Sequence, residues 1–113
     1  MAIPENATLL RLYVGEKDRL EHRPLYEAIV LRAREHGLAG ATVLRGLLGF
    51  GASSLLHTAK ILRLSDDLPI VIEIVDADHQ IASFLPVLEE MMPSGVAMIE
   101  QVRIVHYGRD SDS

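Results

Sequence analysis

Apolar and polar residues alternate along the chain with two periods, which together predict four strands and two helices. An apolar residue at every second position is typical of strands, and this pattern occurs in residues 8–15, 41–50, 70–75 and 96–107. Apolar residues three and four positions apart are typical of a helix with one buried face. They occur from Pro24 to His36 and again in a later segment, at Ile81, Phe84, Leu85, Leu88 and Met92.

Proline, glycine and aspartate mark the expected ends of both helices. Pro24 suits the first helical position, because its fixed φ fits a helix and its missing N–H needs no partner there. Gly37 is expected to end the first helix in the left-handed conformation. Asp76 or Asp78 is expected to cap the second helix, since a short carboxylate accepts hydrogen bonds from the first-turn N–H groups. Pro86 removes one backbone hydrogen bond, so a kink is expected near it.

The order strand, helix, strand, strand, helix, strand predicts an α+β fold. Two right-handed crossovers joined in this way give a ferredoxin-like βαββαβ sandwich, a four-stranded antiparallel sheet with two helices on one face. The chain is expected to be a single domain over residues 1–113, with an ordered core over 8–107 and a flexible tail over 108–113.

The second face of such a sheet has no helix to cover it, and it is expected to be substantially apolar. The strand alternation assigns apolar side chains to this face at Leu9, Tyr13, Val43, Leu47, Val71, Val75, Val105 and Tyr107. It interrupts them with charges at Arg11, Arg45, Glu73 and Arg103. A stable monomer rarely leaves so much apolar area in water. Self-association through the sheet is therefore predicted.

Composition and charge narrow the classes of function. The net charge of −5 argues against a nucleic-acid binder, which needs a basic face for the phosphate backbone. The chain has no cysteine, so it carries no disulfide framework and no thiolate zinc site, and a cytoplasmic location is the default expectation. Its first residues lack the layout of a signal peptide, and no apolar run approaches the roughly 20 residues that span a bilayer.

The stretch from Gly46 to Pro69 is the candidate functional segment, because it is too long for a hairpin turn between strands. Its glycines, hydroxyls and spaced cations are groups that hold a small anion. The predicted ligand-binding residues are Arg45, Gly49, Gly51, Ser53, Ser54, His57, Lys60, Arg63 and Arg103. Each also has a plainer interpretation: glycines serve turns, loop hydroxyls bond their own backbone, and cations form solvated faces.

Metal and catalytic motifs are absent from the sequence. The five histidines have no H-x-x-x-H spacing, so no metal site is predicted. There is no nucleophile elbow, no P-loop and no cysteine nucleophile, and the protein is therefore expected not to be an enzyme. An active site built between subunits stays open as the alternative, in the form of a small trimeric isomerase or lyase.

Two long runs carry a family resemblance. They read P-L-Y-E-A-I-V-L-R-A-R-E-H-G-L-A-G-A-T-V-L-R-G-L-L-G-F-G-A-S-S and H-T-A-K-I-L-R-L-S-D-D-L-P-I-V-I-E-I-V-D. Together they resemble a family of small bacterial and archaeal PII-like proteins of unknown function, over nearly the whole chain from Thr8 to Tyr107. The resemblance implies a ferredoxin-like subunit, a homotrimer packed through its sheets, and a segment over residues 50–67 that corresponds to the T-loop of PII signalling proteins.

The resemblance also implies a function. In PII proteins the T-loop and a loop before the last strand shape an intersubunit cleft for adenine nucleotides, and the T-loop contacts transporters or enzymes. Here that segment is shorter, and Pro93-Ser94-Gly95 lacks the basic, glycine-rich sequence of true PII proteins. The prediction is a regulatory protein that binds a small anionic metabolite or nucleotide between subunits. It would act through residues 50–67 on a membrane transport protein or an enzyme, with no cofactor specified.

Overall fold

A computed structural model of the chain describes residues 5–49, 57–58 and 68–108. Its longer elements are, in order, β1 (Asn6–Gly15), α1 (Leu25–His36), β4 (Thr42–Arg45), β7 (Pro69–Asp76), α2 (Asp78–Met91) and β8 (Val96–Arg103). Four two-residue strands lie between them: β2 (Arg19–Leu20), β3 (Arg23–Pro24), β5 (Leu48–Gly49) and β6 (His57–Thr58). The order of the longer elements is βαββαβ, as the sequence predicts.

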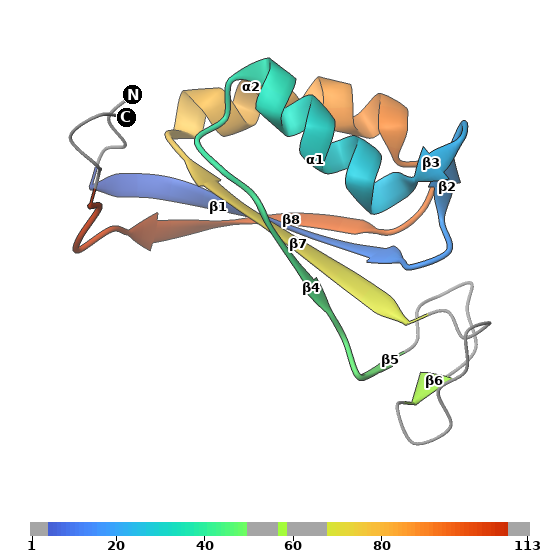
Figure 1. The fold of residues 1–113 in the computed structure, drawn as a ribbon. Coiled ribbons are helices and arrows are strands. Elements are labelled where there is room, and N and C mark those ends of the chain that lie inside the picture. The colour runs from blue at the N-terminus through green and yellow to red at the C-terminus, as the bar shows by residue number, and fades with distance from the viewer. Residues whose placement is uncertain (1–4, 50–56, 59–67, 109–113) are drawn as a thin grey trace.

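One four-stranded sheet with the order β4-β7-β1-β8 organises the molecule, and every neighbouring pair is antiparallel. Figure 1 shows α1 and α2 side by side on one face of this sheet, while the other face carries no described helix. The short strands β5 and β6 pair with each other and project beyond the end of β4 and β7, away from the chain termini (Figure 1). The predicted α+β fold is confirmed.

The core lies between the sheet and the two helices. Every second residue of β1 and β7 points into it, at Leu10, Leu12, Val14, Ile70, Ile72 and Ile74. The helices contribute the apolar residues that recur at spacings of three and four, among them Leu25, Ile29, Ile81, Phe84 and Leu88. Burying these side chains is the main term that stabilises the fold. None of the described helices is long and apolar enough to cross a membrane.

The helix ends follow the sequence in part. Gly37 adopts a φ of 91° after α1, and the two N–H groups beyond the helix bond to Ala33 and Arg34, so its predicted role as a cap is confirmed. Pro24 directly precedes the helix instead of occupying its first position. The aspartate cap of α2 was predicted wrongly. Its N-cap is Ala77, with no side-chain capping bond, because the carboxylates of Asp76 and Asp78 bond other partners.

Two predicted strands are shorter in the structure. The segment predicted over 41–50 breaks into β4 and β5 at Gly46, whose N–H donates to the Pro69 carbonyl at 2.7 Å. A Cβ on Gly46 would lie 2.7 Å from Pro69 Cγ, so the chain crosses there at a distance that only glycine tolerates. The last strand ends at Arg103, and the segment over 104–108 leaves the sheet after one further bond from Ile104 N–H to the Glu5 carbonyl.

The sheet face without helices, called the open face below, is built from cross-strand rows. One row is apolar across all four strands, at Leu44, Val71, Tyr13 and Val96. The next row is Thr42, Glu73, Arg11 and Met98. The expectation for β1 and β7 is confirmed, but that for Val43, Arg45 and Arg103 is wrong. Their register partners are Ile72, Ile70 and Asn6, which belong to the helix side of the sheet.

Candidate functional site

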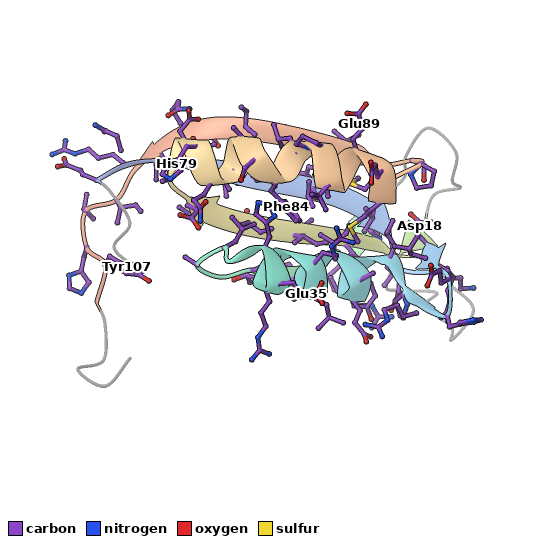
Figure 2. The ribbon with its side chains drawn as sticks, turned by 90° about the horizontal axis from the view of Figure 1, so that it is seen from above. Asp18, Glu35, His79, Phe84, Glu89 and Tyr107 are labelled. Atoms are coloured by element: carbon purple, nitrogen blue, oxygen red, sulfur yellow. The ribbon has the colours of Figure 1, made fainter. Side chains whose placement is uncertain are left out.

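One hollow of the described chain lies where β1 begins and β8 ends. It has a volume of about 430 Å³, and we call it the connector hollow. Four segments line it: the α1–β4 connector, β4, β7 and the residues after β8. Its lining residues are Ala39, Gly40, Ala41, Thr42, Glu73, Val75, Ile104 and Tyr107. Figure 2 shows Tyr107 beyond this end of the sheet, at the opposite end from Asp18.

The connector itself forms one wall of the hollow. After the Gly37 cap, Leu38 is buried in the core and anchors the chain. The next three residues, 39–41, are alanine or glycine and are exposed. A Cβ placed on Gly40 would meet no atom within 4 Å, and its φ is not in the left-handed region. This wall therefore consists of backbone and methyl groups, with room left beside Gly40.

A polar wall comes from the open face. Thr42 and Glu73 lie opposite each other in the β4–β7 ladder, which places a hydroxyl beside a carboxylate. Glu73 Oε2 accepts a bond from Arg11 Nε at 2.9 Å, and both side chains are about one third exposed. This bond is the main cause that raises the pKa of the Arg11 guanidinium. Glu100 adds a weaker pair, 3.8 Å from Arg11 Nη1. The carboxylate beside the hollow is thus charge-paired.

The residues after β8 form the third wall. Ile104 is held by its N–H bond to the Glu5 carbonyl, and Arg103 Nε donates to Glu5 Oε2 at 2.7 Å. Tyr107 presents a partly exposed aromatic ring. An exposed arginine, paired with Glu5, therefore stands one residue along the chain from the lining.

The predicted ligand-binding residues are distributed unevenly. Gly51, Ser53, Ser54, Lys60 and Arg63 lie outside the described residues. Gly49 and His57 pair opposite each other in the β5–β6 ribbon. Arg45 ends β4 and donates to Glu16 at 3.0 Å.

Arg45 and Arg103 do not meet within one chain. They lie on the two outer strands, and the register places Arg45 level with Val14 of β1 but Arg103 level with Asn6. Eight strand residues separate those levels, on the order of 25 Å. A cluster that contains both arginines within one chain is excluded, and one formed between chains stays a prediction.

Several lining residues were missed by the sequence analysis. Gly40, Thr42 and Val75 belong to no motif, and Ile104 was assigned to a longer strand. The one local signal is the run of small residues, Ala39-Gly40-Ala41, directly after a helix cap. Within residues 5–49, 57–58 and 68–108, no three His, Asp or Glu side chains are placed to hold a metal ion.

A second hollow of about 420 Å³ lies between the end of α2 and β8. Leu85, Leu88, Met92, Ala97 and Ile99 dominate its lining, and Glu89 stands at its side. Ser94 and Gly95 of the turn before β8 also line it.

Comparison with known proteins identifies the family. Residues 7–104 match DUF190, described as "Uncharacterized ACR, COG1993". The chain belongs to this family. A UPF0166 protein of Aquifex aeolicus is 34% identical over 98 residues, which cover 87% of this chain and 92% of that protein. These relatives show the family without naming an activity.

Solved structures show the fold. The PII-like protein CPII from Thiomonas intermedia K12, bound to ADP and bicarbonate, is similar with a TM-score of 0.61 and 19% identity, over 93% of this chain and 95% of that chain. The divalent cation tolerance protein CutA1 from Thermus thermophilus gives a TM-score of 0.59 and 12% identity, over 90% and 87% of the two chains. The chain therefore has a PII-like fold.

Proposed function

We propose that this protein is a PII-like regulatory subunit that binds an adenine nucleotide in the connector hollow without turning it over. The observation that carries the proposal is the hollow itself, which joins backbone, apolar, aromatic and polar groups in one place. Its volume falls within the range of small-molecule sites. The similarity to CPII, a protein bound to ADP, supports the choice of nucleotide.

The lining suits a base and ribose. An aromatic ring at Tyr107 and aliphatic side chains at Val75 and Ile104 offer surface against which a base packs. The Thr42 hydroxyl and the Glu73 carboxylate offer a polar edge. Binding without turnover is supported by the pairing of Glu73 with Arg11, because the Glu73 carboxylate already accepts the hydrogen bond from Arg11 Nε.

The phosphates require cations, and one chain supplies few of them near the hollow. Arg103 is the neighbouring cation, whereas Arg45 stands at the far end of the sheet. A second chain that brings its Arg45 to this hollow would add a cation for an anion site. Lys60 and Arg63, which the sequence predicts as ligands of the same anion, lie outside the described residues. The site we propose is therefore shared between subunits.

The open face supports a homotrimer as the assembly. Its row Leu44, Val71, Tyr13 and Val96 crosses the whole sheet, and Leu44 and Val96 are each about half exposed. Contact between copies would remove this row from water. It would also partly cover the Arg11–Glu73 pair, which keeps both charges matched.

Binding is tested by calorimetry with ADP on the wild type and on Gly40→Leu. A Cβ at this position meets no atom within 4 Å in the free protein, and the rest of the leucine side chain would take up space in the hollow, so we expect the Kd to rise at least about tenfold. Gly40→Ala, with one methyl group, is the matched control and should change the Kd far less. Equal affinity of Gly40→Leu and wild type, or no ADP binding by the wild type, contradicts the proposal. The absence of turnover is checked by incubating the protein with ADP, and the nucleotide should be recovered unchanged.

Assembly is tested by light scattering on Leu44→Glu. A charge in the apolar row should lower the measured mass from that of a trimer to that of a monomer. Leu31→Glu is the control, because Leu31 is exposed on α1, away from the open face. A monomeric wild type at micromolar concentration rules out the trimer.

Signalling through residues 50–67 concerns a segment of which the structure describes residues 57–58 alone. We propose that ADP binding slows hydrogen exchange in residues 52–64, as expected when an effector orders a segment that contacts a transporter or enzyme. If the amides of residues 52–64 are already as protected as those of Ile70 to Ile74 before ADP is added, this role is contradicted.

A further inference from the structure

A buried carboxylate stands behind the connector hollow. Asp76 ends β7 with 0% of its surface exposed, and it and Thr8 are the polar side chains that the described core buries. Its Oδ1 accepts from the Ala77 N–H at 2.7 Å, and its Oδ2 accepts from the Ala39 N–H at 2.9 Å. The second bond joins residues 37 positions apart.

Asp76 has no cationic partner among the described residues. Burial of a carboxylate is unfavourable, and among the described residues two backbone N–H groups compensate for it. An apolar residue at this end of β7 would extend the Ile70, Ile72, Ile74 series of the core at no such cost. The Asp76 carboxylate is therefore expected to have a specific structural role, and its two hydrogen bonds indicate that role.

The bond to Ala39 fixes the start of the connector. Gly37 and Leu38 bond back to α1, and Asp76 takes the next N–H. The anchored residue and the two that follow it, 39–41, are exposed and all line the connector hollow. Small residues without packed side chains have little else to hold their direction.

We infer that Asp76 is a positioning residue for the ligand site: its carboxylate holds residues 39–41 in the conformation that forms one wall of the connector hollow. The inference rests on the proposed function for the ligand, an adenine nucleotide. Asp76 itself lies behind the wall and does not touch the ligand.

Thr8 provides a matched control. It is opposite Asp76 in the β1–β7 ladder and is equally buried. Its Oγ1 donates to Asp78 Oδ1 at 3.0 Å and accepts from Gln101 Nε2 at 3.3 Å, and neither bond reaches the connector. Thr8→Val removes a buried polar group at the same place without releasing Ala39.

The experiment compares full-length wild type, Asp76→Asn and Thr8→Val by amide hydrogen exchange and by calorimetry with ADP. In Asp76→Asn one oxygen becomes an NH₂ donor and the negative charge that strengthened both bonds is lost, so the bond to the Ala39 N–H is broken or weakened whichever way the amide turns. We expect exchange at Ala39 to quicken at least about tenfold and the Kd for ADP to rise about fivefold or more. Thr8→Val should lower the stability but leave both quantities within about twofold of wild type.

The outcomes separate this inference from the proposed function. If the wild type does not bind ADP, the proposal of an adenine nucleotide as the ligand is overturned. The exchange rate of the Ala39 amide in Asp76→Asn still tests whether Asp76 anchors the connector. An Asp76→Asn variant that binds ADP like wild type, or no worse than Thr8→Val, overturns the inference. If Asp76→Asn does not fold, the test is made on wild type without ligand. Slow exchange of the Ala39 amide supports the anchor, whereas exchange as fast as that of an unprotected amide overturns the inference.

Discussion

The two ends of the sheet are held together in different ways. Where β1 begins, called the connector end, polar side chains join the segments: the buried Thr8 and Asp76, together with the exposed Asp78, bond across β1, β7, α2 and the connector. Where β1 stops, called the turn end, glycines let backbone lie directly on backbone. Each end carries a hollow, and Gly95 itself lines the one at the turn end. The two ends therefore differ in the groups that join their segments, and the connector end is the one at which we propose the ligand site.

The turn end depends on the absence of a Cβ at two positions. Gly95 precedes β8 with a φ of +100°, and a Cβ there would lie 2.6 Å from the Tyr13 carbonyl oxygen. Gly46 crosses Pro69 at a similar distance. The same turn end carries a bond from the Gly15 N–H to Asp18 Oδ2 at 2.9 Å. Substitution of glycine by alanine at the two ends thus measures the difference between them.

The largest effect is expected from Gly95→Ala. Its left-handed backbone and the contact with Tyr13 both oppose a methyl group, so the free energy of unfolding should fall by about 3 kcal/mol. Denaturant unfolding gives the value. A loss below about 0.5 kcal/mol would show that the turn end does not depend on this glycine.

A smaller loss is expected from Gly46→Ala. The methyl group meets Pro69 Cγ, a ring atom that shifts more easily than backbone, and overpacking of this kind costs about 2 kcal/mol. The same unfolding measurement applies. Retention of the Gly46 N–H bond to Pro69 in the variant, read from slow amide exchange, would confirm that the loss comes from packing.

At the connector end, Thr8→Val should lower the free energy of unfolding by about 1 kcal/mol. The valine keeps the shape but leaves Asp78 and Gln101 without their shared hydroxyl. Thermal and denaturant unfolding both report the change. No loss at all would mean that those two side chains find water instead, and that the polar row contributes little to stability.

The smallest effect is expected from Gly40→Ala. Its Cβ meets no atom within 4 Å, so the free energy of unfolding should change by less than about 0.5 kcal/mol. A loss as large as that of Gly46→Ala would erase the contrast between the two ends. Such a result would show that the space around Gly40 is too tightly packed for a methyl group.

The sequence predicts the fold well because its local patterns agree with one another. Leu10, Leu12 and Val14 alternate, and the helices show the expected apolar spacing. The face of β4 was predicted wrongly because Val43 and Leu44 are both apolar, so alternation alone does not choose between them. The choice comes from pairing with Val71 and Ile72, nearly thirty residues later.

The site is less predictable for a related reason. Asp76 looks like a helix cap in sequence, since it stands just before an apolar-periodic segment. Its actual partner, the Ala39 N–H, becomes visible only when the α1–β4 connector lies beside β7. The hollow likewise joins residues from 39–42, 73–75 and 104–107, which no local pattern relates.

The position of β1 has a consequence for synthesis of the chain. Of the described strands it is made first, and it is an inner strand of the sheet, yet its partners are residues 69–76 and 96–103. Its apolar residues therefore stay unpaired until β7 has been made, and the second edge of β1 stays unpaired until β8 follows. Such long-range pairing slows folding and exposes the unpaired strand to aggregation. A chain truncated before β8 would leave β1 with only one of its two neighbours.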